Sequence, residues 1–187
     1  MRIAEDYMQR EAWRWPAYLT PEKKAGNLLR NGSFEIQGDN QDWTTKSWRK
    51  NAEAATIAEG LAQDGNRSAF VQAAIADDAF FAQEVAVRPN TNYLLSGWVK
   101  TKGVTLVEKI RNVGANLSVH GVFAEHSLSV TGDSDWNYVV LQFNSGPLTK
   151  VQALARLGFN NSTCTGKAWF DDLCLIEDPW VPPSSTK

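Results

Sequence analysis

Two acidic motifs near opposite ends of the chain could together bind a metal ion. They are Gly-Ser-Phe-Glu at residues 32–35 and Ala-Trp-Phe-Asp-Asp-Leu-Cys-Leu-Ile-Glu at residues 168–177. Glu35 and Asp171 are the best carboxylate donors. Asp172 is the alternative to Asp171, because neighbours in a strand point to opposite faces. The competing interpretation is that these acids are ordinary turn or edge residues that accept backbone hydrogen bonds.

The motifs can meet only if the first and last segments of the domain lie side by side. Between them, alternating apolar residues and turn residues predict short strands at residues 68–76, 81–87, 93–100, 115–122, 136–143, 151–160 and 167–176. Short strands separated by Gly-, Asp-, Asn- and Ser-rich turns predict an all-β protein, an antiparallel β-sandwich of the jelly-roll type.

The strands define one domain with an extension at each end. Residues 27–177 form the predicted sandwich, and residues 1–26 form an extension that contains a predicted helix at residues 3–13 and is then interrupted by prolines. Residues 178–187 are rich in Pro and Ser, as in a linker to another domain. We therefore expect a piece of a longer protein.

Composition narrows the range of partners and chemistry. The 187 residues carry a formal charge of -2, which gives no basis for binding nucleic acid or an anionic membrane surface. No segment has the roughly 20 apolar residues of a membrane span or the core of a signal peptide. The two cysteines, Cys164 and Cys174, exclude a disulfide-rich scaffold and leave a bridge between them undecided.

Strand alternation collects polar side chains on one face of three strands. On residues 93–100 the core set is Tyr93, Leu95, Gly97 and Val99, and residues 115–122 and 151–160 have similar apolar sets that include Phe159. The opposite positions carry Trp98, Lys100, Asn116, His120, Gln152 and Arg156. This face is either an ordinary solvated surface or a groove in which sugars stack on an indole and hydrogen-bond to polar groups.

Four segments, in order, resemble carbohydrate-binding modules of families four, nine, sixteen and twenty-two. They are NLLRNGSFE, TNYLLSGWVKT, GDSDWNYVVLQF and TGKAWFDDLCLIE, and they span residues 27–177. The resemblance implies a non-catalytic, extracellular jelly roll that tethers a carbohydrate-active enzyme to a polysaccharide. It also implies a structural calcium ion shared by the first and last motifs. Carbonyl groups near Ser33 and in the loop with Asp64 and Asn66 could supply further oxygen ligands, of which calcium takes about six to eight.

Two further tryptophans and the absence of a catalytic cluster complete the prediction. Trp43 and Trp48 lie in a polar stretch and could form a wall of the sugar site or cap the sandwich edge, whereas Trp136 and Trp169 are assigned to structure. His120 and His126 match no zinc spacing, and no Gly-x-Ser-x-Gly motif occurs. We therefore predict polysaccharide binding without catalysis. The alternatives are a structural sandwich that binds no sugar, and a jelly-roll lyase or glycoside hydrolase.

Overall fold

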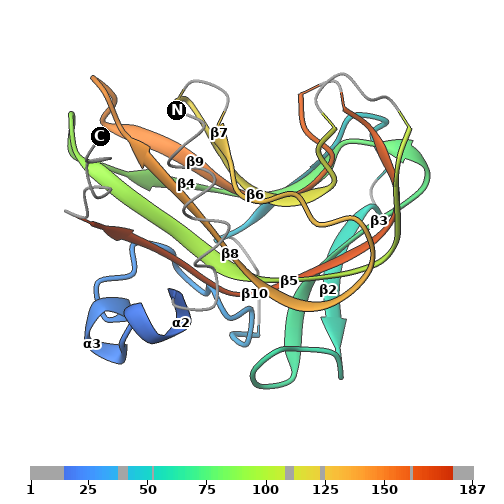
Figure 1. Cartoon of the computed structure of the whole chain (residues 1–187), viewed down its shortest axis with the longest axis horizontal. Coiled ribbons are helices and arrows are strands. Elements are labelled where there is room, and N and C mark those ends of the chain that lie inside the picture. The colour runs from blue at the N-terminus through green and yellow to red at the C-terminus, as the bar shows by residue number, and fades with distance from the viewer. Residues whose placement is uncertain are drawn as a thin grey trace, which may run out of the picture.

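Two antiparallel five-stranded sheets pack face to face in the computed structural model (Figure 1). The structure describes residues 15–37, 42–51, 53–107, 112–122, 125–160 and 162–178. Sheet A has the strand order β1-β4-β9-β6-β7, and sheet B has the order β2-β3-β10-β5-β8. The elements are α2 (Trp15–Tyr18), α3 (Pro21–Lys24), β1 (Thr44–Ser47), β2 (Ala55–Glu59), β3 (Arg67–Asp77), β4 (Ala79–Ala86), β5 (Asn92–Leu106), β6 (Ala115–His120), β7 (Glu125–His126), β8 (Gly132–Asn144), β9 (Lys150–Leu157) and β10 (Cys164–Glu177).

The predicted all-β sandwich is confirmed. Each of the seven predicted strands corresponds to one of the long strands β3, β4, β5, β6, β8, β9 and β10. The short strands β1, β2 and β7 were not predicted, because two to five residues are too few to show alternation. The predicted helix at residues 3–13 lies outside the described residues.

The main core lies between the sheets and consists of the inward-facing residues that alternation predicts. Tyr93, Leu95 and Val99 of β5 pack there with the inward residues of β6 and β9. Phe159 departs from this pattern. It is buried but contacts the His126 ring and the Arg156 guanidinium, because Gly158 before it adopts a left-handed conformation and interrupts the alternation.

The first and last motifs lie side by side, as predicted. The Leu28 N–H donates to the Leu175 carbonyl at 2.8 Å, and the Leu173 N–H donates to the Gly32 carbonyl at 2.9 Å. These contacts begin where the pairing of β10 with β3 ends, at Phe170. A Cβ atom on Gly32 would lie 2.1 Å from the Leu173 carbonyl oxygen. Glycine therefore permits this close approach of the two segments.

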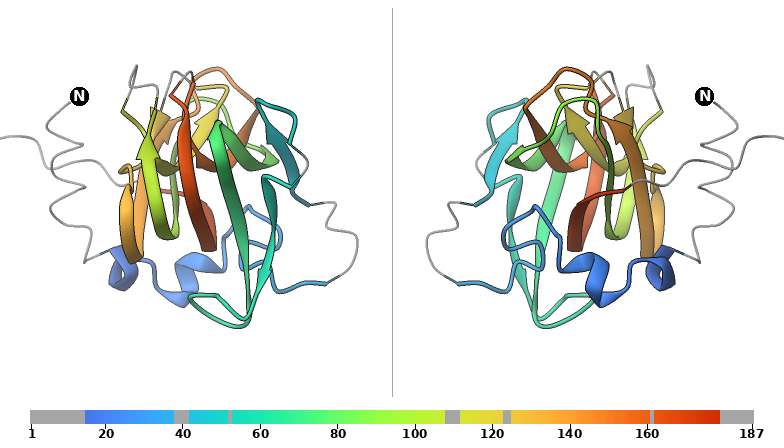
Figure 2. Two further views of the ribbon diagram at one scale, coloured as in Figure 1. Left: turned by 90° about the vertical axis from the view of Figure 1, so that its right-hand side faces the viewer. Right: turned by 90° about the vertical axis from the view of Figure 1, so that its left-hand side faces the viewer.

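Residues 15–25 cover one end of the outer face of sheet B, and α2 and α3 lie beneath that sheet in Figure 2. Leu19 packs there in a second apolar cluster with Leu94, Tyr138, Val140, Cys174 and Ile176. The Tyr18 hydroxyl donates to Asp178 at 2.9 Å, and Lys24 forms an ion pair with Asp172. This end of the sheet therefore has an apolar layer on both sides.

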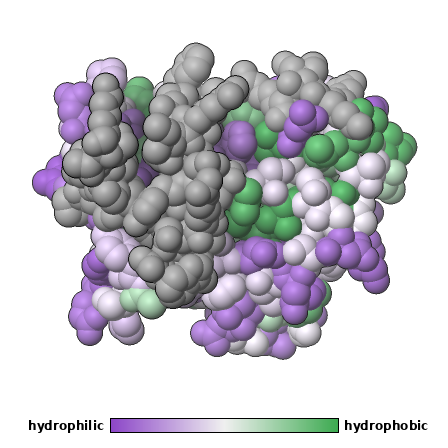
Figure 3. Space-filling view, in the orientation of Figure 1, coloured by the Kyte–Doolittle hydropathy of each residue, from purple (hydrophilic) through white to green (hydrophobic). Residues whose placement is uncertain are grey.

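The surface combines polar and apolar regions. In the orientation of Figure 1, hydrophilic residues line the lower border of the molecule, and hydrophobic residues gather near the centre and right of the view (Figure 3). No helix within the described ranges is long and apolar enough to cross a membrane.

Candidate functional site

The predicted polar face is divided between the two sheets. Asn116, His120, Gln152 and Arg156 lie on β6 and β9 of sheet A, whereas Trp98 and Lys100 lie on β5 of sheet B. The prediction that these three strands share one face is therefore wrong. Alternation shows which residues of one strand share a side, but it does not show which strands are neighbours. The molecule consequently has two separate outer faces to consider.

The Trp98 side chain packs against its own sheet. Its ring meets the Tyr138 ring edge to face, with centroids 5.0 Å apart, and it borders the apolar cluster that Leu19 covers. On the same strand, Leu94 and Ser96 alternate with the core residues and so share the side of Trp98, which the sequence predicts to be polar, but both are buried. The segment formed by α2 and α3 covers Leu94 through Leu19. Ser96 instead accepts a hydrogen bond from the Tyr138 hydroxyl at 3.0 Å. Trp98 is therefore a poor platform for a sugar.

The outer face of sheet A has a continuous register across its strands. One row is Lys46, Phe80, Arg156 and Asn116; the next is Thr44, Ala82, Leu154, Ser118 and His126; the third is Glu84, Gln152 and His120. His120 is exposed and Gln152 is half-buried. These two side chains are cross-strand partners, so they offer an imidazole and an amide side by side.

Arg156 has a structural partner on this face. Its Nε atom donates to Asp78 Oδ1 at 2.6 Å, and its Nη2 atom donates to Asp78 Oδ2 at 2.5 Å. The guanidinium also lies 5.1 Å from the centroids of the Phe80 and Phe159 rings. Both charged residues are buried. This bidentate pair engages the Nε and Nη2 atoms of Arg156 and gives the side chain a structural role.

Asn116 and Ser118 contribute buried polar atoms to the same face. The Asn116 amide donates to the carbonyls of Gly114 and Gly158 at 2.9 and 3.0 Å. Asn116 Oδ1 and the Ser118 hydroxyl have no hydrogen-bond partner within the described residues. Buried polar groups nearly always have one. Both side chains are fully buried, so an enclosed water molecule, rather than a ligand at the surface, could supply the missing partner.

The two tryptophans near β1 have opposite environments. Trp43 is buried, 5.3 Å from the Phe34 ring centroid, and its indole N–H donates to the Asn31 carbonyl at 3.1 Å. Trp48 is 78% exposed. Its main-chain N–H donates to the Asp78 carbonyl at 3.0 Å. Trp48 directly follows the last residue of β1, so it lies at the end of sheet A where Asp78 binds Arg156.

The predicted metal-binding acids converge on one loop. Glu35 Oε1 accepts hydrogen bonds from the main-chain N–H groups of Asn66 at 2.8 Å and Arg67 at 2.6 Å. Asp171 Oδ2 accepts from the N–H groups of Gln63 at 2.8 Å and Asp64 at 3.1 Å. The loop around Asp64 is thus held by two carboxylates, one from each motif. A Cβ atom on Gly65 would lie 2.5 Å from Glu35 Oε1, so the loop needs glycine here.

The hydrogen-bonding groups of this loop disfavour a bound cation, whereas the charge of Asp171 favours one. The groups of Asp64 and Asn66 that face the carboxylates are N–H donors, whereas a cation requires oxygen atoms. However, burial raises the pKa of Asp171, although three main-chain N–H groups counteract this shift. Within the described residues Asp171 has no ion-pair partner, and Asp172 pairs instead with Lys24.

The described residues contain no group of three or more His, Cys, Asp or Glu side chains that could hold a metal ion. A calcium ion beside Glu35 and Asp171 would therefore take most of its ligands from main-chain carbonyls. Ser33, which lies between Gly32 and Phe34, is exposed and could offer such a group. The two carboxylates provide negative charge for a cation, but the described side chains provide too few oxygen ligands to complete its coordination shell.

Comparisons with known proteins agree with this architecture. No protein-family model matches the chain. Exochitinase 1 from Streptomyces olivaceoviridis is 30% identical over 167 residues, which cover 86% of this chain and 24% of that protein. The chain thus spans about a quarter of the length of the curated relative it matches.

Solved structures of carbohydrate-binding modules share the fold. A family 61 module in complex with β-1,4-galactotriose has a TM-score of 0.57 and 18% identity, covering 81% of this chain and 99% of that one. The C-terminal family 22 module of Clostridium thermocellum Xyn10B has a TM-score of 0.53 and 15% identity, covering 84% and 98%. The chain is therefore a jelly-roll β-sandwich with the fold of carbohydrate-binding modules, as its sequence predicted.

Proposed function

We propose that this chain is a non-catalytic module that binds a polysaccharide on the outer face of sheet A. The observation that carries this proposal is the exposure of Trp48, whose indole is 78% accessible at the end of a face with polar side chains. An exposed indole is costly to leave in water, and its flat ring suits the apolar face of a pyranose. Trp48 thus replaces Trp98 as the proposed platform.

The other side chains of this face supply hydrogen bonds. His120 and Gln152 are accessible neighbours on β6 and β9, and both can donate to and accept from sugar hydroxyls. Lys46 is exposed in the row of Phe80 and Arg156, two rows from His120 and Gln152. Arg156 contacts Phe80 and pairs with Asp78, so its role on this face is structural. Binding of this kind needs no nucleophile or general base.

The comparisons support a glycan as the ligand class. Their names refer to an exochitinase, to β-1,4-galactotriose and, for a Clostridium thermocellum xylanase module with a TM-score of 0.50, to xylohexaose. Chitin, β-1,4-galactan and xylan are therefore the first ligands to test. The short coverage of the chitinase also supports attachment to a catalytic domain. Such an assembly would act on an insoluble substrate outside the cell.

The test is retention on these three polysaccharides in pull-down or affinity electrophoresis. Trp48→Ala should reduce retention on the cognate polysaccharide at least about tenfold, because truncation of a Trp that anchors a ligand commonly costs roughly 2 kcal/mol or more. Ile75→Ala removes an apolar side chain that is 69% exposed on β3 of the opposite sheet; it is the control and should retain full binding. If Trp48→Ala were retained as strongly as the control variant, the binding site would not include Trp48 on sheet A. No retention by the native chain on any of the three would favour a purely structural sandwich.

We also propose a structural calcium ion beside Glu35 and Asp171. The support is the convergence of two carboxylates from distant motifs on one loop, together with the burial of Asp171 without a cationic partner among the described residues. The ion would join the first and last motifs and fix the loop around Asp64. When bound, it supplies only charge compensation and cross-linking.

A further inference from the structure

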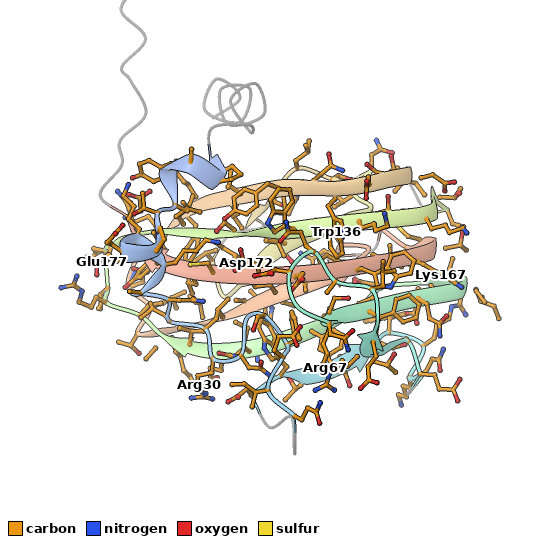
Figure 4. All side chains as sticks on the ribbon, turned by 90° about the horizontal axis from the view of Figure 1, so that it is seen from below. Arg30, Arg67, Trp136, Lys167, Asp172 and Glu177 are labelled. Carbon is orange, nitrogen blue, oxygen red and sulfur yellow. The ribbon has the colours of Figure 1, made fainter. Side chains whose placement is uncertain are left out.

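The outer face of sheet B has a hollow at the end that α2 and α3 do not cover. It has a volume of about 660 Å³ and is lined by Trp169, Lys100, Lys102, Lys167 and residues of β8. Ligand clefts commonly measure roughly 300–1,000 Å³. Figure 4 looks onto this sheet, with the helices at the end near Glu177 and Lys167 near the opposite end.

Lys102 and Lys167 are directly opposed on neighbouring strands. They are Cα partners in the register of β5 and β10, and both are exposed. Like charges in this position repel and destabilise a sheet. Within the described part of the chain neither lysine has an ion-pair partner. An anion seated between the two ammonium groups would relieve the repulsion.

The aromatic ring beside them offers a stacking surface. Trp169 is the Cα partner of Lys100 on one side and of Phe70 on the other. The Phe70 and Trp169 rings stack, with centroids 5.1 Å apart and planes 29° from parallel. Trp169 lines the hollow and Phe70 does not. Phe70 therefore supports one side of the indole, and the hollow lies on the side toward Lys100.

The acidic residues at the rim are already engaged. Asp135 accepts a hydrogen bond from Lys100 at 2.6 Å and one from the Trp136 N–H at 2.9 Å. Asp133 accepts from the Gly103 N–H at 2.6 Å. Asp135 therefore balances Lys100, whereas Asp133 keeps its negative charge, so the lining carries three lysines against two aspartates. The hollow thus combines an indole with a net positive charge, and neither Lys102 nor Lys167 forms an ion pair among the described residues.

A neighbouring hollow extends this surface toward β3. It measures about 360 Å³ and is lined by Gln72, Ala73, Ala74, Thr165 and Gly166 together with the same two lysines. Lys102 and Lys167 belong to both hollows, so they stand between the two volumes. A ligand that uses both must be longer than one ring. A chain of sugars meets that requirement.

We infer that this surface is a second binding site, separate from sheet A, for an acidic polysaccharide. One sugar ring stacks on Trp169, and carboxylate or sulfate groups of that ring or the next lie between Lys102 and Lys167. The inference does not depend on the site around Trp48, because the two surfaces lie on opposite sides of the sandwich.

The test compares polygalacturonate with its methyl ester, which has the same sugar backbone without the charges. Native protein should be retarded in gels that contain polygalacturonate and much less in gels with the ester. Dextran sulfate, compared with dextran, separates sulfate from carboxylate recognition. Retardation should weaken as salt rises, because contacts between exposed charges are screened.

Variants locate the site without risk to folding. Lys102→Gln with Lys167→Gln changes two exposed side chains and should weaken binding to polygalacturonate about tenfold, as expected for the loss of two exposed ion contacts. Lys150→Gln is the matched control, since it removes an exposed lysine from sheet A, and should bind as the native chain does. Trp48→Ala should also bind polygalacturonate normally.

Three results would overturn this inference. They are equal retardation by the ester, equal loss in the Lys150 control, or binding of single-stranded DNA as strong as that of either charged polysaccharide. Loss of neutral polysaccharide binding in Trp48→Ala with intact polygalacturonate binding would support both sites. The double lysine variant should lose binding to polygalacturonate and keep binding to neutral polysaccharide. Because each variant affects a different ligand, a failure of this inference can be distinguished from a failure of the proposed function.

Discussion

The Arg156–Asp78 pair stands out among the charged residues because both partners are buried, with two hydrogen bonds and two aromatic rings around the guanidinium. Removal of one partner from such a pair leaves an unpaired charge in the interior. We expect Asp78→Ala to lower the free energy of unfolding by about 3–5 kcal/mol. Urea denaturation followed by tryptophan fluorescence measures this change.

A matched control for this prediction lies toward the other end of β4. Glu84 pairs with Lys150 at 3.2 Å on the exposed surface of β4 and β9. Glu84→Ala should change stability by less than about 1 kcal/mol, because exposed pairs contribute little. If Asp78→Ala were no more destabilising than Glu84→Ala, the structural role given to Arg156 would be incorrect.

The sequence predicted which polar side chains share a face of sheet A, but not which of them have partners within the protein. The sequence indicated that Arg156, Asn116 and Gln152 share a side of the sheet, and they do. It could not show that Asp78, which lies 78 positions from Arg156, would form a buried ion pair with the Arg156 guanidinium. Nor could it separate Trp43 from Trp48, because the exposure of each depends on Phe34 and the sheet edge.

At the scale of elements, residues 15–25 act as a cover for sheet B. Leu19 is 2% exposed and packs over Cys174, whereas Cys164 lies at the far end of the same strand. Both cysteines are free and buried, which excludes a bridge between them in this structure. Burial raises the pKa of Cys174 to about 11 and that of Cys164 to about 12. Both thiols should therefore react slowly while the protein is folded.

Loosening the cover should affect only one of these thiols. In Leu19→Ala, which removes a buried contact between the segment and the sheet, we expect Cys174 to react several-fold faster with a thiol reagent, while Cys164 keeps its native rate. Alkylation at pH 8 followed by peptide mass spectrometry measures the two sites separately. Leu28→Ala, a change at a side chain that is 41% exposed, is the control. Equal acceleration of both thiols would indicate global unfolding and contradict a separate cover.

Periodicity predicted the long strands and their inward faces, but not this cover or the short edge strands. Leu94 appears on the polar side of a strand in the sequence, and its burial follows from Leu19, which lies far from it in the chain. The hollow at Trp169 was missed for a related reason. Lys102 and Lys167 become neighbours only through the pairing of β5 with β10, and their opposed charges were the signal that could have identified the site once that pairing was known.

At the scale of the whole molecule, the sandwich presents two outer faces with different chemistry. Sheet A offers Trp48, His120 and Gln152 without a large excess of charge, and sheet B offers Trp169 with opposed lysines. The net charge of -2 conceals this difference. A module with both sites could hold a neutral and an acidic polysaccharide together, as occurs where such polymers lie side by side in one matrix.

The first and last motifs both hold the loop around Asp64, and the calcium proposal can be tested through the stability of that contact. Burial raises the pKa of Asp171, so without a cation the native state holds its proton more tightly than the unfolded state does. Stability of the metal-free protein should therefore fall as pH rises from the unfolded pKa of about 3.9 through the raised value, and the full cost should be present at neutral pH. Calcium binds the ionised carboxylate and should remove this cost.

We accordingly expect calcium to raise the melting temperature more at pH 7 than at pH 4. Thermal melts with excess chelator and with millimolar calcium, at both pH values, measure the difference. A cation-induced rise of about 4 °C or more at pH 7 would correspond to at least roughly 1–2 kcal/mol for a domain of this size. Magnesium at the same concentration is the control, since it prefers a smaller octahedral shell and keeps its water. Melts that coincide with and without calcium at both pH values would leave Glu35 and Asp171 as acceptors of main-chain hydrogen bonds alone, because those contacts already hold the loop around Asp64 without a metal.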